Sequence, residues 1–211
     1  MINSAILTTA YASPVQYFSK LLAFDKVLIE VHENYNKQSY RTRCQILSAN
    51  GPLFLSIPVQ KGEQIKCNIR KVRIDYSKRW QAIHWKAIES AYRSSPFFIY
   101  YADDIKPFYE NQEFQLLYDF NTSFQASICK LLDLKVSIVE TQQYKTEYSE
   151  TLDYRNLIHP KKNITDNMFS PKPYFQVFEN KFKFVPNLSI LDLLFNMGPE
   201  SKDVLKSSVY P

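Results

Sequence analysis

The order of apolar and polar residues at the start of the chain predicts a strand, a helix and a second strand. Residues 3–10 form a short apolar run of strand length, and residues 26–31 form another that is rich in β-branched side chains. Between them apolar residues recur at helical spacing after Ser13, the expected N-cap, and Pro14. Such a stretch is a βαβ unit, which predicts parallel strands joined by a right-handed crossover.

A β-hairpin is expected next. Asn50-Gly51 is a strong turn signal, and it separates two runs that alternate like strands. In the first run Arg41, Arg43 and Gln45 occupy alternate positions, so they share one face of the predicted strand. The two arginines should therefore form a row on that face.

The rest of the chain alternates between helical and loop-like patterns. Helical periodicity covers about residues 77–134, with Ser77 as the expected N-cap of the first helix. Residues 135–141 form a further strand candidate, and about residues 143–173 are polar and loop-like. A compact apolar helix near the C-terminus should stop at Gly198.

Composition supports this picture of a folded α/β protein. The chain has 211 residues, of which 45% are hydrophobic and 22% are charged, as in soluble globular proteins. We expect one α/β domain over residues 1–211. It should contain the βαβ start, a mainly parallel sheet, the inserted β-hairpin and a C-terminal helical part.

Composition also excludes several classes of site. Three glycines leave no glycine-rich phosphate loop, and three widely separated cysteines without a C-x-x-C pair predict neither disulfides nor a zinc site. No apolar run is long enough to span a membrane. No basic residue precedes the apolar run at the N-terminus, so we expect no signal peptide and a cytoplasmic protein.

The net charge of +5 is unevenly distributed. Residues 37–79 contain ten basic side chains but only two acidic ones, Glu63 and Asp75. The basic residues are Lys37, Arg41, Arg43, Lys61, Lys66, Arg70, Lys71, Arg73, Lys78 and Arg79. This asymmetry predicts an anionic partner for the region: a phosphate, a carboxylate, nucleic acid or an acidic membrane surface.

One short stretch inside this region is the first candidate for ligand contact. Its members are Asn34, Tyr35, Lys37, Gln38, Tyr40, Arg41 and Arg43. Arginine offers a planar fork to phosphate or carboxylate, and lysine adds a mobile point charge, which together suit a diphosphate or a sugar phosphate. We expect a phosphate-bearing sugar or nucleotide to bind here, and the alternative is a solvated hairpin face.

Histidines supply the candidates for acid–base chemistry. His32 and Glu33 follow the second strand, where the ends of parallel strands commonly face a ligand crevice. His84 lies on a predicted helix, as either a general base or a structural residue, whereas His159 lies in a loop without such a context. No spacing typical of a metal site or of a serine nucleophile occurs, and the sequence identifies no cofactor.

Four separated segments resemble the WbqC family of bacterial proteins. They are ENYNKQSYRTRCQI, LSIPVQKG, IRKVRIDYSKRWQAIHWKAIESAYRSSPFFIYY and FVPNLSILDLLFNMGPES, and they occur in the family's order. The resemblance runs from about Ala5 to Glu200. It implies an α/β fold, and it adds Tyr11, Asn187 and Asp192 as substrate-binding candidates because they match the family's motifs.

The resemblance also implies a function, because family members are often encoded among genes for surface polysaccharides such as O-antigen. It implies a transferase acting on a nucleotide- or lipid-diphosphate-linked sugar, and leaves open whether a glycosyl, acyl or aminoacyl group is transferred. The alternatives are a non-catalytic scaffold of a glycan-assembly complex and a nucleic-acid-binding module. Because no nucleic-acid recognition motif occurs, we expect no nucleic-acid partner, while the oligomeric state stays open.

Overall fold

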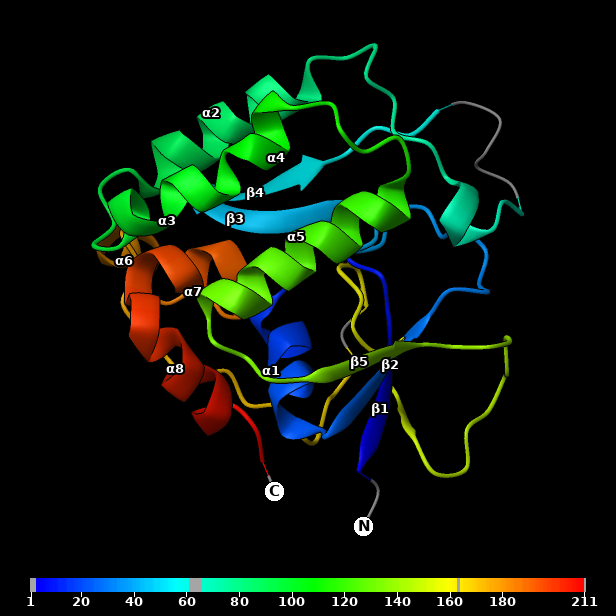
Figure 1. Ribbon diagram of the computed structural model, residues 1–211. Helices are drawn as coiled ribbons and strands as arrows, with labels where there is room; N and C mark the ends of the chain where they lie inside the picture. The colour runs from blue at the N-terminus through cyan, green and yellow to red at the C-terminus, as the bar shows by residue number, and fades with distance from the viewer. Residues whose placement is uncertain (1–2, 61–65, 163, 211) are drawn as a thin grey trace.

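The computed structural model describes residues 3–60, 66–162 and 164–210 (Figure 1). Its architecture combines α-helices with a parallel sheet and a separate antiparallel hairpin, which confirms the predicted α/β class. A cluster of buried hydrophobic residues joins the two parts. The sheet and the hairpin together position the candidate site.

The parallel sheet is built on the predicted βαβ unit. β1 (Ser4–Thr8) and β2 (Lys26–Glu30) pair in parallel, and α1 (Val15–Ala23) connects them. Two later strands complete the sheet: β5 (Ser137–Glu140) pairs with β2, and β6 (Leu152–Asp153) pairs with β1. The strand order is β5-β2-β1-β6 with all pairs parallel, and the two-residue β6 is the strand that the sequence did not predict.

The start of α1 corrects one prediction. The N-cap residue is Pro14 and not Ser13, and it provides no side-chain cap. Instead, the Oδ1 atom of Asn187 accepts a hydrogen bond of 2.9 Å from the backbone N–H of Gln16. A residue near the end of the chain thus satisfies one of the unpaired amides in the first turn of the first helix.

The predicted hairpin forms from β3 (Arg43–Ser48) and β4 (Gly51–Ser56). The last residue of β3 pairs with the first residue of β4, so the two-residue turn is Ala49-Asn50. Gly51, at φ +108°, therefore belongs to β4, and the turn lies one residue earlier than the sequence indicated.

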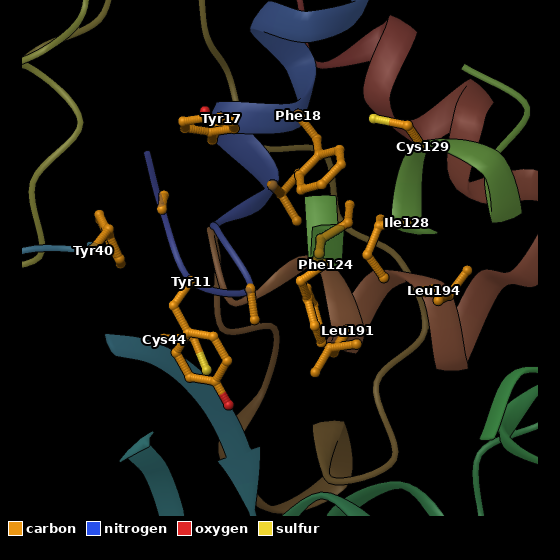
Figure 2. Packing of buried hydrophobic residues seen from close by; sticks show 14 of the residues in the cluster. Tyr11, Tyr17, Phe18, Tyr40, Cys44, Phe124, Ile128, Cys129, Leu191 and Leu194 are labelled. Carbon is orange, nitrogen blue, oxygen red and sulfur yellow. The ribbon is translucent and has the colours of Figure 1, made fainter. Parts of the chain in front are cut away.

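The hairpin has a buried face and an open face. Cys44 is fully buried and lies beside the ring of Tyr11 (Figure 2). Arg43 and Gln45 alternate with it and are half-buried on the opposite face. Arg41 precedes β3 and is buried, so the predicted row of arginines does not form.

Helices pack against the hairpin and link it to the sheet. α2 (Trp80–Tyr92), α3 (Phe98–Ile105) and α4 (Pro107–Glu110) lie on one side of the hairpin, and α5 (Leu117–Leu131) runs between the hairpin and the sheet (Figure 1). These helices occupy the region that the sequence predicted to be helical.

The first of these helices begins two residues later than predicted. Its N-cap residue is Arg79, and Ser77 does not cap it. The backbone N–H of Ser77 donates instead to Oδ1 of Asp75, 2.9 Å away. This local turn before α2 keeps Ser77 exposed.

The C-terminal part consists of short helices. They are α6 (Glu179–Phe182), α7 (Ile190–Met197) and α8 (Ser201–Ser207), and the 3₁₀ turn η2 (Gly198–Glu200) lies between α7 and α8. Another 3₁₀ turn, η1 (Ile69–Lys71), lies earlier in the chain, between β4 and α2. α7 stops at Gly198 as predicted, but α8, which the sequence did not predict, comes directly after η2. Among the helices that the structure describes, none is both long and apolar enough to cross a membrane.

Of the two glycines that the structure describes, Gly198 should be the harder to replace, because a Cβ atom there would overlap the ring of Phe97 and its φ is +52°. We expect Gly198→Ala to lower the free energy of unfolding by about 3 kcal/mol, since the ring must move and the backbone is left-handed. Urea unfolding measures this change. In a Phe97→Ala background the same substitution should cost only about 1 kcal/mol, and equal costs in both backgrounds would contradict the overlap.

Candidate functional site

The loop between β2 and β3 carries most of the predicted site residues, and a buried ion pair closes it. Nε of Arg41 donates to Oε1 of Glu33 at 2.7 Å, and Nη2 donates to Oε2. Burial raises the pKa of the Glu33 carboxyl, and the hydrogen bonds and charge of Arg41 oppose that rise. Arg41 therefore holds the loop together and is not a free cation.

The loop turns tightly between these two residues. Oγ of Ser39 donates to the Asn36 carbonyl at 2.6 Å, and the backbone N–H of Thr42 donates to the Ser39 carbonyl at 3.3 Å. Gln38 takes a left-handed backbone conformation with φ +58°. The turn leaves Lys37 and Gln38 exposed at its tip.

A cavity of about 510 Å³ lies beside this turn, on the open face of the hairpin. Its cationic residues are Lys37, Arg43 and Lys78, and its acidic residue is Asp75. Other lining residues include Tyr35, Gln38, Ser56 and Ser77. This Arg43 cavity has the size of a small-molecule site and offers both cations and hydroxyl donors.

The positive charge of the Arg43 guanidinium is not neutralised by an acidic partner among the described residues of this cavity. No described residue forms a hydrogen bond or an ion pair with it, although its Nε atom is buried. Its guanidinium carbon lies 5.8 Å from the centre of the Phe54 ring. Lys37 and Lys78 also form no ion pair with a described residue, so three cations face one acidic side chain across the cavity.

Other basic residues of the region are used within the fold. Arg41 is bound by Glu33, and Arg70 forms an exposed ion pair with Glu140. Lys61 lies outside the described residues. Of the basic residues of this region that the structure describes, only Lys37, Arg43 and Lys78 line the Arg43 cavity.

A second cavity, of about 470 Å³, lies two residues further along the same face of β3. Gln45 lines it together with Tyr40 and Asn187, two of the predicted site residues. The segment that follows β6 forms its opposite wall with His159 and Lys162. We call it the Gln45 cavity.

Sequence reasoning set His159 aside, and it did not name Gln45 or Lys78 as site residues either, although all three line the cavities. Nδ1 of His159 accepts a hydrogen bond of 3.1 Å from the backbone N–H of Lys161, so the neutral ring presents its Nε2–H. Burial lowers the pKa of His159, and the nearby charge of Lys162 lowers it further. No local sequence pattern predicts that His159 lines a cavity. The segment that carries it reaches the loop before β3 through tertiary contacts, such as the hydrogen bond from Lys161 to Gln38.

Tyr11 and His84 lie behind the hairpin. The hydroxyl of Tyr11 is 2.9 Å from Nδ1 of His84 and 2.8 Å from the hydroxyl of Tyr109. Burial lowers the pKa of His84 to about 4, and a hydrogen bond with the backbone of Ser56 opposes this shift. Because Ser56 lines the Arg43 cavity, this hydrogen-bonded group supports the cavity wall from inside the core.

Two other predicted residues also have structural partners. Nε2 of His32 lies 2.9 Å from the carbonyl oxygen of Thr141. Oδ2 of Asp192 accepts hydrogen bonds from the Tyr174 hydroxyl, 2.7 Å, and from Nε2 of Gln176, 2.9 Å. Burial raises the pKa of Asp192 to about 6, and these hydrogen bonds oppose the rise.

The structure divides the predicted residues into three groups. Tyr35, Lys37, Gln38 and Arg43 line the Arg43 cavity, and Tyr40 and Asn187 line the Gln45 cavity. Neither cavity is lined by Tyr11, His32, Glu33, Asn34, Arg41, His84 or Asp192. In the parts of the chain that the structure describes, no group of three His, Cys, Asp or Glu side chains could hold a metal ion.

Comparison with known proteins places the chain among bacterial relatives. The model of the WbqC-like protein family matches residues 10–172 and 160–204. An uncharacterised protein of Mycobacterium tuberculosis is 26% identical over 229 aligned positions, which cover 98% of each chain. No solved structure matches.

The burial of His84 should make stability depend on pH. Above pH 6.5 the imidazole of His84 is neutral in both the folded and the unfolded protein, so its contribution to the free energy of unfolding is complete. Between pH 6.5 and the folded pKa of about 4, the unfolded chain binds a proton at His84 and the folded protein does not, so stability falls as the pH falls. Relative to His84→Gln, the wild-type protein should lose about 3 kcal/mol of unfolding free energy between pH 6.5 and 4.

Urea unfolding of both proteins at several pH values measures this difference. The rise in the pKa of Asp192 acts in the opposite direction over part of the same range, but it is common to both proteins and cancels. Parallel stability curves for the two proteins would contradict the assignment to His84.

Proposed function

This chain belongs to the WbqC-like protein family, and on that premise we propose that it binds a phosphate-bearing sugar in the Arg43 cavity. The ligand is a nucleotide- or lipid-diphosphate-linked sugar, and the protein acts on it as a transferase of bacterial surface-polysaccharide assembly. The phosphate part of this proposal rests on the geometry of the cavity. The polysaccharide part rests on the resemblance to the family.

One observation carries the proposal: the guanidinium of Arg43 has a buried Nε atom, and no described residue forms a hydrogen bond or an ion pair with it. Leaving a buried donor unpaired costs about 1–3 kcal/mol, so such a group favours an external acceptor. Phosphate oxygens suit it, since the planar fork of arginine can donate two parallel hydrogen bonds to one phosphate. Lys37 and Lys78 line the same cavity and add point charges for a second phosphate.

The cations would also serve a transfer reaction. In a glycosyl transfer, a nucleophilic group of the acceptor forms the new bond to the sugar as the bond between the sugar and the diphosphate breaks. The electron pair of the broken bond stays on the phosphate oxygen, and negative charge grows there. Arg43 and the two lysines stabilise that charge because they are already in place before the reaction. Glu33 contributes indirectly, since its ion pair with Arg41 fixes the loop that carries Lys37.

A non-catalytic scaffold is the second candidate, and one surface feature favours it. Ile99 and Tyr100 are consecutive residues of α3 and are 78% and 71% exposed. Exposed apolar side chains of this size are common where proteins meet partners. A scaffold that only binds protein partners does not require a polar cavity lined by cations without ion-pair partners. We therefore rank the ligand-binding role first.

Replacing Arg43 with Gln should weaken the binding of diphosphate ligands. Loss of charge-assisted hydrogen bonds worth about 1.5–3 kcal/mol corresponds to about 10- to 100-fold weaker affinity. Isothermal titration calorimetry with inorganic pyrophosphate and with uridine, thymidine and guanosine diphosphate sugars measures the effect.

The matched control is Arg93→Gln, because Arg93 is an exposed arginine at the end of α2 and outside both cavities. It should bind like the wild-type protein. If Arg43→Gln and Arg93→Gln bind every phosphate ligand equally well, or if the wild-type protein binds none, the Arg43 cavity is not a phosphate site.

A further inference from the structure

We propose that the Gln45 cavity binds the ring of a sugar, while the adjoining Arg43 cavity holds the phosphates attached to it. This inference deepens the proposed function and rests on it for the identity of the phosphate site. It assigns the second cavity a ligand of a definite chemical class, a pyranose. It also explains why two cavities open on one face of a single strand.

The register of β3 places the two cavities next to each other. Arg43 and Gln45 are two residues apart, so their side chains leave the same face of the strand about 7 Å from each other. Each lines its own cavity. A ligand that places a phosphate beside Arg43 would thus place the group attached to that phosphate beside Gln45.

The Gln45 cavity contains unpaired polar groups of the kind that sugars need. The amide of Gln45 and the hydroxyl of Tyr40 form no hydrogen bond with a described residue, although Tyr40 is only 9% exposed. An amide and a hydroxyl can each both donate and accept. Sugar hydroxyls need partners of this dual kind, whereas a phosphate needs only donors.

The same cavity also has apolar walls. Pro160, Phe169 and Pro186 line it together with these polar groups. A pyranose ring combines polar edges with C–H faces, and ligand sites commonly combine apolar walls with a few placed polar groups. At about 470 Å³, the cavity is large enough for such a ring.

One wall of the Gln45 cavity is held in place without a ligand. Asn187, in a left-handed backbone conformation with φ +55°, donates from Nδ2 to Oε1 of Gln16 at 3.1 Å. Gln16 in turn donates from Nε2 to Oδ2 of Asp166 at 2.8 Å. Asp166 forms an ion pair of 2.8 Å with the fully buried Lys20, and this chain of contacts fixes the wall.

Binding of simple sugars tests the inference without any phosphate. The probes are the methyl glycosides of glucose, galactose and N-acetylglucosamine, and the measurement is saturation-transfer difference NMR on the full chain. At least one glycoside should receive saturation at its ring protons with the wild-type protein. The signal should fall at least about fivefold in Gln45→Ala and in Tyr40→Phe, variants that break no hydrogen bond within the described structure.

Two further variants separate this inference from the proposed function. Gln112→Ala, an exposed glutamine outside both cavities, should bind the glycosides like the wild-type protein, and so should Arg43→Gln. Pyrophosphate binding should be lost in Arg43→Gln and unchanged in Gln45→Ala.

Each outcome has one meaning. No signal with any of the three glycosides, or an equal signal in Gln45→Ala, overturns the sugar site. A glycoside signal that depends on Gln45 supports the sugar site even if pyrophosphate does not bind, and in that case only the phosphate-binding function fails.

Discussion

The buried ion pair between Glu33 and Arg41 is the interaction on which the candidate site depends. Both side chains are removed from water, and an isolated buried charge would be costly, so each one requires the other. The pair joins the two ends of the loop that runs from the sheet to the hairpin. It therefore sets the position of the turn at Lys37 and of the start of β3 at the same time.

This pairing also explains how one basic segment serves two purposes. Arg41 and Arg43 are separated by one residue, yet the first lies inside the fold with an acidic partner and the second lies on a cavity wall without one. The difference arises where the chain enters β3, because strand alternation begins only at Arg43. Arg41 has a structural role because the carboxylate of Glu33 lies within hydrogen-bonding distance of its guanidinium, whereas Arg43 has no such carboxylate among the described residues.

Local patterns predicted the elements that depend on neighbours in sequence. The βαβ start, the hairpin, whose turn lies one residue earlier than predicted, and the end of α7 at Gly198 each result from propensity, turn chemistry or periodicity over a few residues. β6 escaped prediction because two residues carry no periodicity, and its strand character comes only from pairing with β1. α8 escaped because a glycine and a proline signal the end of one helix but not the start of another.

The candidate site was predictable only in part, for the same reason. The sequence identified Lys37 and Arg43 from their density of charge, since that signal is local. It did not identify His159, which lies more than a hundred residues away from the hairpin along the chain and reaches it through tertiary contacts. His84 has the residue type of a base, but burial among Tyr11 and other aromatic residues gives it a supporting position.

The hydrogen bond from the first turn of α1 to Asn187 limits the order in which parts of the fold can form while the chain is synthesised. β1, α1 and β2 emerge from the ribosome before β5 and β6, which follow more than a hundred residues later. Asn187 emerges later still. Until these segments emerge, the βαβ unit has neither its sheet neighbours nor the residue that accepts a hydrogen bond from its helix. The parallel sheet can be completed once β6 has emerged, whereas the wall of the Gln45 cavity can form only after Asn187 has emerged.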